Sequence, residues 1–160
     1  MTSDQAVRDH VLALLDGGQA HMSFDDAVAD FPADKINVKP PNVPYTPWHL
    51  IEHLRRTQWD ILDYTRNPDY KELNWPTDYW PEQDAKTDMA GWQKTIDQFQ
   101  ADLAEMRTIV ADPKTNLTVP IAHGYGGHTV LREALLLADH NAYHIGELGI
   151  LRQVMDAWPK

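Results

Sequence analysis

The sequence predicts an all-α fold, a four-helix bundle in a single domain that spans residues 1–160. Prolines and glycines divide the chain into four long segments, and in each of them apolar residues recur every three or four positions. No segment alternates apolar and polar residues for long, and only residues 116–123, NLTVPIAH, are compatible with a short strand. A chain of 160 residues is typical of one domain and can bury a sizeable core without covalent cross-links.

The composition excludes several classes of protein. The chain has no cysteine, which rules out disulfides, thiolate metal ligands and cysteine nucleophiles together. Its formal net charge is -10 and its only basic run is LRR at residues 54–56, so neither nucleic acid nor an anionic membrane is expected as a partner. No apolar stretch approaches the ~20 residues of a membrane span, and the first residues lack the pattern of a signal peptide. We therefore expect a soluble, cytoplasmic protein.

The N-terminal third of the chain predicts one long helix and one short one. Residues 4–16 carry apolar side chains at helical spacing and are followed by two glycines, which end the helix. A shorter helical piece starts with Ser23 as its cap and stops at Pro32. Residues 36–47, INVKPPNVPYTP, should then run as an extended, proline-rich loop.

Three further long helices follow. The second long helix is expected over residues 47–66, because Thr46 is a suitable cap and proline is favoured in a first turn. The third is expected over residues 88–110, where apolar side chains recur at steps of three or four. The last should run from Thr129, as its cap, to about residue 157. Since this last segment is apolar almost all round, we expect it to be the most buried helix.

Two loops separate these helices. Residues 67–87 contain three prolines and four aromatic residues, and they are long for a structureless connection. Such a loop either packs as an ordered cover or forms part of a site. Residues 123–128, HGYGGH, lack the spacing and the lysine of a phosphate-binding loop, so tight turns are expected there.

The last helix carries a pattern that is typical of metal sites. His140 and His144 are four positions apart, so their side chains lie one above the other on one helix face and can bind a single ion. Asn141, Tyr143 and Glu147 are close enough in sequence to hydrogen-bond the second nitrogen of such a ligand. The alternative is that the two histidines are hydrogen-bonded residues of the core.

A third ligand is expected, because a catalytic zinc ion usually has three protein ligands and an open position. His49 and His53 on the second long helix are the candidates. At about 100° per residue, both lie off the centre of the apolar stripe, so neither should be deeply buried. His53 lies nearer that stripe and is the better candidate. Alternatively, His49 is a water-exposed residue of the first turn and His53 is bonded to a loop carbonyl.

Three segments resemble the DinB superfamily, four-helix-bundle proteins related to bacillithiol- and mycothiol-dependent S-transferases. They are TPWHLIEHLRRTQWDIL at residues 46–62, WPTDYWP at 75–81 and TVLREALLLADHNAYHIGELGILRQVMDAWP at 129–159. The resemblance implies a divalent cation such as zinc or nickel, bound by one histidine near the start of the second long helix and by the pair on the last helix. Carried over, these are His53, His140 and His144. The resemblance also implies a homodimer. The additional His49 leaves the choice on the second long helix open.

Such a site supports two reactions. A divalent ion held by three neutral imidazoles can lower the pKa of a water or a thiol toward neutrality. The first reaction is hydrolysis. The second is transfer of an external, low-molecular-weight thiol to a small electrophilic substrate, and it fits a chain without cysteine. Zinc and nickel are not distinguished by the residues.

Other side chains are candidates for the surroundings of the metal. Glu147 lies on the same helix face as the histidine pair and is the candidate catalytic residue, as a general base, unless it is a fourth ligand, a partner of a ligand, or ion-paired with an arginine. An aromatic roof over a small-molecule pocket is expected from the loop. The pocket candidates are His49, Trp75, Tyr79, Trp80 and Tyr143.

Two alternatives to an enzyme remain from the sequence. In the first, the ion only cross-links two helices, as in a non-catalytic metal-binding protein associated with stress. In the second, the chain is a helical interaction module whose histidines are hydrogen-bonded in the core. Metal content separates the second alternative from the others.

Overall fold

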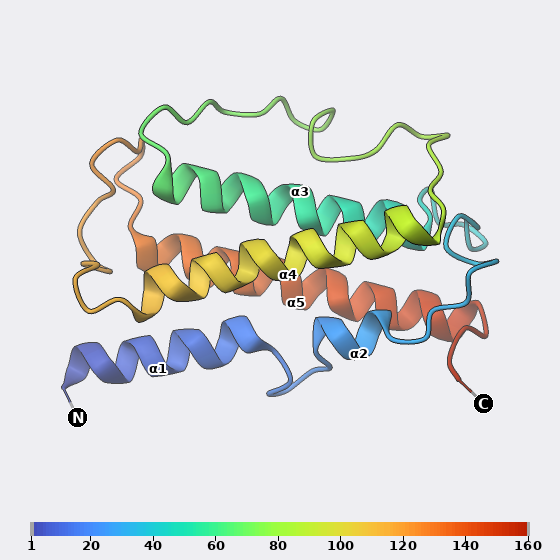
Figure 1. Cartoon of the computed structure of the whole chain (residues 1–160), viewed down its shortest axis with the longest axis horizontal. Coiled ribbons are helices and arrows are strands. Elements are labelled where there is room, and N and C mark those ends of the chain that lie inside the picture. The colour runs from blue at the N-terminus through green and yellow to red at the C-terminus, as the bar shows by residue number, and fades with distance from the viewer. Residues whose placement is uncertain (1, 160) are drawn as a thin grey trace.

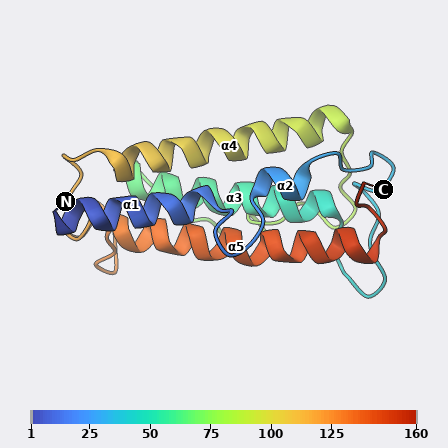
Figure 2. The same ribbon diagram turned by 90° about the horizontal axis from the view of Figure 1, so that it is seen from below.

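The computed structural model describes residues 2–159, which contain five helices and no strand. The helices are α1 (Ser3–Asp16), α2 (Phe24–Val28), α3 (Pro47–Arg66), α4 (Met89–Ala111) and α5 (Val130–Val154). The four long helices run along the long axis of the molecule, and the short α2 continues the line of α1 (Figures 1 and 2). The prediction of an all-α bundle with four long helices is confirmed. The expected strand at residues 116–123 is reduced to an isolated bridge between Pro120 and Thr129.

The helices begin where capping chemistry predicts. The hydroxyl of Thr46 accepts a hydrogen bond from the backbone N–H of His49 at 3.1 Å, and Thr129 caps α5 in the same way. At its other end α5 is shorter than expected. It stops at Val154 because Asp156 adopts a left-handed conformation, with φ of 50°, which a continuing helix does not allow.

The expectation that α5 is the most buried helix is wrong, because α3 is. In α3, 13 of 20 residues are buried, whereas in α5 the figure is 11 of 25. The number of helix neighbours does not explain the difference, because α5 packs against α1, α2, α3 and α4, whereas α3 packs against α4 and α5. The difference arises because the loop of residues 67–87 also covers α3, along its outer side (Figure 1). One face of α5 instead stays exposed. Its exposed apolar side chains are Leu135, Leu136, Tyr143, Ile150 and Val154.

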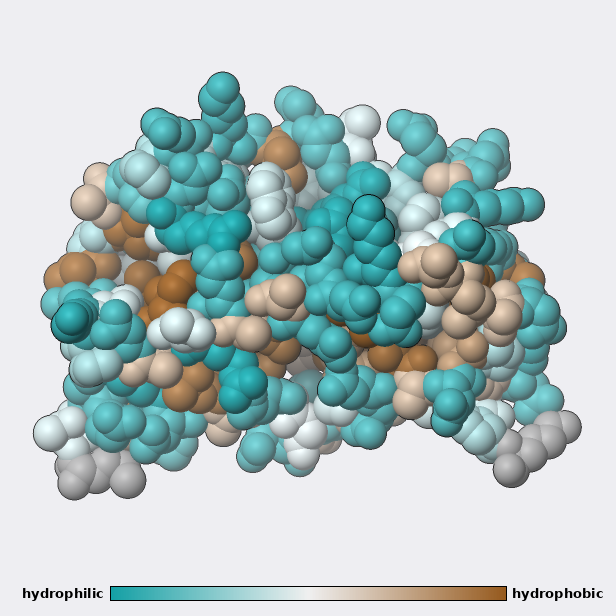
Figure 3. Space-filling view, viewed as in Figure 1, coloured by the Kyte–Doolittle hydropathy of each residue, from teal (hydrophilic) through white to brown (hydrophobic). Residues whose placement is uncertain are grey.

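The core consists of two clusters along the bundle. One lies at the end near α2 and contains Phe24, Trp92 and Phe99, while the other lies around Leu62 and Met106. The side with α4 in front is largely hydrophilic, as Figure 3 shows, since the outward positions of α4 carry mostly polar residues. Among residues 2–159, no helix combines the length and the apolar character that crossing a membrane requires.

Candidate metal centre

Three histidines from two helices meet between α3 and α5. They are His53 on α3 and His140 and His144 on α5, and one ring nitrogen from each lies within 4.8 Å of the other two. The Nε2 atoms of His53 and His140 are 3.2 Å apart. The three rings contact one another edge to face, with centroids 4.5–5.1 Å apart. The pair that is four positions apart in sequence is thus joined by one of the two candidates on α3.

The spacing of two of these nitrogens fits a shared ion. Two imidazole nitrogens bound to one tetrahedral zinc ion at about 2.0–2.1 Å lie roughly 3.3–3.4 Å apart. The separation of 3.2 Å between His53 Nε2 and His140 Nε2 is close to that value. Little movement of these two rings is therefore needed for both to bind one ion. The cluster can bind a metal ion.

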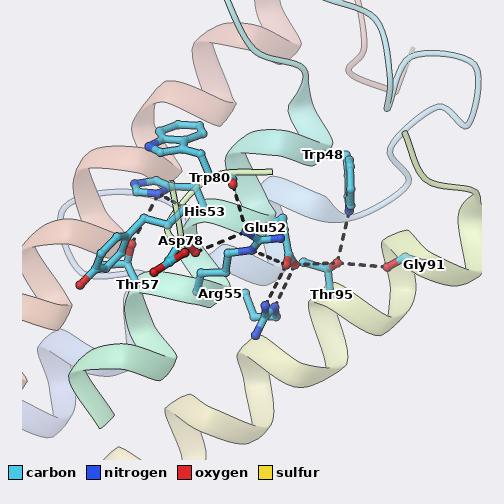
Figure 4. Close-up of polar contacts among 11 residues, drawn as sticks. Trp48, Glu52, His53, Arg55, Thr57, Asp78, Trp80, Gly91 and Thr95 are labelled. Carbon is cyan, nitrogen blue, oxygen red and sulfur yellow. Dashed lines mark hydrogen bonds and ion pairs between the residues drawn. The ribbon is translucent and has the colours of Figure 1, made fainter. Parts of the chain in front are cut away.

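The ring of His53 is held on its edge and on its face. Its Nδ1 donates a hydrogen bond to the backbone carbonyl of Tyr79 at 3.0 Å. The indole of Trp80 stacks on the imidazole, with centroids 3.9 Å apart and planes inclined by 5° (Figure 4). Because Nδ1 carries the proton, the neutral ring presents the lone pair of Nε2 to the cluster.

His144 is oriented by a carboxylate. Its Nδ1 donates to Oε2 of Glu147 at 2.6 Å, which again leaves Nε2 for the cluster. The ring of Tyr143 packs edge-on against His144, at a centroid distance of 4.9 Å. Burial, followed by the nearby charge of Glu147, raises the pKa of Tyr45, a residue of the proline-rich loop. An ion pair of Glu147 with an arginine is the alternative, but Arg152 of the same helix donates to the carbonyls of Ala27, Ala29 and Ala157.

Burial keeps two of the three rings neutral. It lowers the pKa of His53 to about 4, despite the opposing hydrogen bond to Tyr79. Burial and the neighbouring imidazoles also lower the pKa of His140 to about 3. At neutral pH both rings are therefore unprotonated, as metal ligands must be.

His49 is not part of the cluster. Its Nε2 donates to the backbone carbonyl of Ala85 at 2.8 Å. The expectation that neither histidine of α3 is deeply buried is wrong, since His49 is 3 % exposed and His53 is 2 % exposed. The reason is the covering loop, which buries a face of α3 that lies outside the apolar stripe.

The loop of residues 67–87 brings its aromatic residues to the site in different ways. Trp80 covers His53, and Tyr79 contributes its backbone carbonyl. Trp75 is 70 % exposed and its ring lies 6.5 Å from that of His53. The loop is therefore both an ordered cover of α3 and a wall beside the histidines. Tyr143 is exposed on the other side, on α5.

Sequence reasoning missed several supporting residues. The buried carboxylate of Asp60 accepts hydrogen bonds from the hydroxyls of Tyr70 at 2.9 Å and Tyr79 at 2.7 Å. The carboxylate of Glu52 binds both Arg55 and Arg56. Glu52 lies three and four positions before these arginines on one helix, so the sequence could have indicated this ion-paired group. Nothing local in sequence joins Asp60 to its two tyrosines.

The helices and the three histidines between α3 and α5 define the class of this protein. It is a helical-bundle protein with a histidine site able to bind metal. A sequence model of the DinB superfamily matches residues 17–148, a range that includes all three histidines. The chain therefore belongs to the DinB superfamily, and the predicted resemblance is confirmed. No curated protein and no solved structure matches the chain.

Proposed function

We propose that this protein is a divalent-metal-dependent enzyme that transfers a low-molecular-weight thiol to a small electrophilic substrate. One observation carries the proposal, namely the convergence of three imidazoles from α3 and α5, with one ring nitrogen of each within 4.8 Å of the other two. Three nitrogen ligands are the usual protein contribution to a catalytic zinc site, and the same donors suit nickel. Zinc or nickel is accordingly the proposed ion.

The absence of a fourth protein ligand supports a catalytic rather than a purely structural site. Within residues 2–159, the group around the three histidines includes no further histidine, cysteine, aspartate or glutamate. Glu147, the candidate for that place, is instead bonded to His144. A structural site is normally closed by a fourth side chain, whereas a catalytic one keeps a position for water or substrate.

The chain's own residues have distinct roles in this proposal. His53, His140 and His144 hold the ion, which would lower the pKa of a bound thiol or water toward neutrality. Glu147 orients His144 and can take up a proton at its carboxylate. Trp75 and Trp80 of the covering loop and Tyr143 of α5 would supply aromatic surface beside the histidines, as small-molecule sites usually require. Tyr79 contributes its backbone carbonyl.

The thiol would come from outside, since the chain has no cysteine. Hydrolysis is the alternative reaction, because the same open position would serve a water. A non-catalytic, metal-binding role in stress is the other alternative. We further propose a single-domain, cytoplasmic homodimer. The exposed apolar face of α5, which includes Leu136, Ile150 and Val154, supports the dimer.

Elemental analysis of the protein purified without a histidine tag tests the proposal. We expect about one equivalent of a divalent transition metal, as a site with three protein ligands binds one ion. The double variant His140→Ala/His144→Ala should carry none. Screens with thiols and electrophiles, and with hydrolysable substrates, then separate transfer from hydrolysis. A protein that gains no metal after dialysis against zinc or nickel would overturn the proposal, and metal binding with no activity in either screen would favour the non-catalytic role.

A further inference from the structure

Three successive backbone carbonyls of the covering loop accept hydrogen bonds from α3. Nη1 of Arg56 donates to the carbonyls of Asp78 at 3.3 Å and Trp80 at 2.9 Å. Nδ1 of His53 donates to the carbonyl between them, that of Tyr79, at 3.0 Å. His53 and Arg56 are three positions apart, so they lie on the same face of α3. Arg56 therefore binds the loop on both sides of the carbonyl that orients His53.

The guanidinium of Arg56 is itself held by a buried carboxylate. Its Nε donates to Oε1 of Glu52 at 2.9 Å, and Glu52 is only 8 % exposed. The same carboxylate accepts two hydrogen bonds of 2.8 Å from Arg55 and one of 3.3 Å from Thr95, as Figure 4 shows. Arg56 is thus fixed between a rigid acceptor on α3 and two carbonyls of the loop.

The segment of residues 78–80 determines how the imidazole of His53 points. Tyr79 binds the edge of the ring and Trp80 covers its face. A competing acceptor lies close by, because the hydroxyl of Thr57 is 3.5 Å from His53 Nδ1. If the loop moved away, the Nδ1 proton would turn toward Thr57 or water, and Nε2 would leave the position that it shares with His140.

We propose that Arg56 is a positioning residue for the metal centre. By clamping residues 78–80 to α3, it keeps the carbonyl of Tyr79 and the indole of Trp80 in the places that direct His53 Nε2 to the ion. This inference rests on the proposed metal site, but it concerns a residue that touches neither the ion nor the substrate.

If Arg56 positions His53, its replacement should weaken metal binding, whereas charge repulsion alone predicts the opposite change in affinity. A guanidinium near a divalent cation repels it, so its removal by charge alone should strengthen metal binding. Loss of a group that orients a ligand typically weakens metal affinity by about 10–100-fold. The direction of the change in affinity therefore decides between the two.

The experiment compares Arg56→Met with Arg55→Met. Both variants remove one cation and one partner of Glu52, but only Arg56 is bonded to the loop carbonyls. Affinity for Co²⁺ is measured by competition with a chelator, and the visible absorption of bound Co²⁺ reports the geometry of the ligands. We expect Arg56→Met to bind Co²⁺ at least about tenfold more weakly, with an altered spectrum, and Arg55→Met to stay close to wild type.

Unchanged or tighter binding by Arg56→Met overturns the inference, as does an equal loss in both variants. Wild-type protein that binds no metal overturns the proposed function instead. In metal-free protein, the nitrogen chemical shifts of the His53 ring test the positioning by themselves. They should show Nδ1 protonated in wild type and a mixture of tautomers in Arg56→Met, and identical shifts would overturn the inference.

Folding of the variants is monitored by thermal unfolding. Asp60 still binds the hydroxyl of Tyr79, so we expect the loop as a whole to stay on α3 when Arg56 is replaced, while the backbone carbonyls of residues 78–80 shift. Arg56→Lys is the milder second variant, because it keeps the charge and the aliphatic stem. Its single nitrogen cannot bridge Glu52 and two carbonyls with the geometry of a guanidinium, so we expect intermediate affinity at an unchanged melting temperature. Full wild-type affinity in Arg56→Lys would overturn the inference that a guanidinium bridging Glu52 and the two loop carbonyls positions His53.

Discussion

The surroundings of His49 and His53 differ in one respect that separates a structural histidine from a candidate ligand. Both residues lie on α3, one turn apart, both are buried, and both donate a hydrogen bond to a carbonyl of the covering loop. His49 uses Nε2, the nitrogen at the far end of its ring, to bind Ala85. His53 uses Nδ1, the nitrogen near its own backbone, to bind Tyr79.

The ring nitrogen that binds the loop decides which nitrogen of each histidine is available to a metal ion. His53 keeps Nε2 free to face His140, whereas His49 has already used the nitrogen that reaches furthest from the helix. A histidine ligand typically donates its second ring N–H to a carbonyl or carboxylate, which fixes its tautomer. The loop carbonyls, rather than position on the helix, therefore assign the two roles. Four experiments test this difference.

The largest expected effect is on metal affinity. His53→Ala removes one of three proposed ligands. Removal of a residue that only orients a ligand lowers metal affinity by at most about 100-fold, so we expect a larger loss of affinity in His53→Ala. His49→Ala should leave the metal affinity within about twofold of wild type, because the His49 ring makes no contact with the cluster. A larger change is expected only from a ligand or from the partner of a ligand. Isothermal titration with Zn²⁺ or Ni²⁺ measures both. Equal losses in the two variants would contradict the assignment of His53.

A smaller loss is expected when the partner of a ligand is changed. Glu147→Gln replaces the carboxylate that accepts from Nδ1 of His144 with a neutral amide of the same shape. We expect metal affinity to fall about 10–100-fold, with one ion still bound. Competition with a chelator gives the affinity, and elemental analysis gives the stoichiometry. Complete loss of the metal would instead make Glu147 a ligand in its own right.

For His49 the expected effect is on stability. His49→Ala leaves the carbonyl of Ala85 without its buried donor, which should lower the free energy of unfolding by about 1–3 kcal/mol. Saturating metal should then stabilise wild type and His49→Ala equally, by about 2.7 kcal/mol at a hundredfold excess over Kd, and should not stabilise His53→Ala. Thermal or urea unfolding with and without metal is the measurement. An increase in the free energy of unfolding of His53→Ala on addition of metal would contradict the assignment of His53 as a ligand.

The last test uses pH on metal-free protein. Burial lowers the pKa of His53 to about 4 and that of His140 to about 3. Both rings are neutral in the folded chain, whereas in the unfolded chain they take up protons below about pH 6.5. Because the unfolded state then binds more protons, these groups add stability above about pH 6.5, and that contribution is lost as the pH falls toward 4 and then 3. When unfolding is measured at several pH values, the free energy of unfolding should fall less steeply with decreasing pH in His53→Ala than in wild type. An equally steep fall in both would argue against the burial of His53.

The sequence by itself determined the helices and the pair on α5. Caps such as Thr46, the breaks at proline and glycine, and the spacing of His140 and His144 act within a few residues, so they can be read along the chain. That α5 would be the most buried helix could not be read in the same way. Apolar residues all round a helix do not show which of its faces the neighbouring elements cover.

Only the tertiary structure decided which histidine of α3 joins the pair, and what holds it there. His53 and His49 lie one turn apart on the same helix. They differ because two loop carbonyls, 26 residues after His53 and 36 residues after His49, reach different ring nitrogens. The same is true of Asp60 with its tyrosines and of Arg56 with the backbone of residues 78–80. Hydrogen bonds to a backbone carbonyl depend on the course of the chain in space, and residue identity at the acceptor does not encode them.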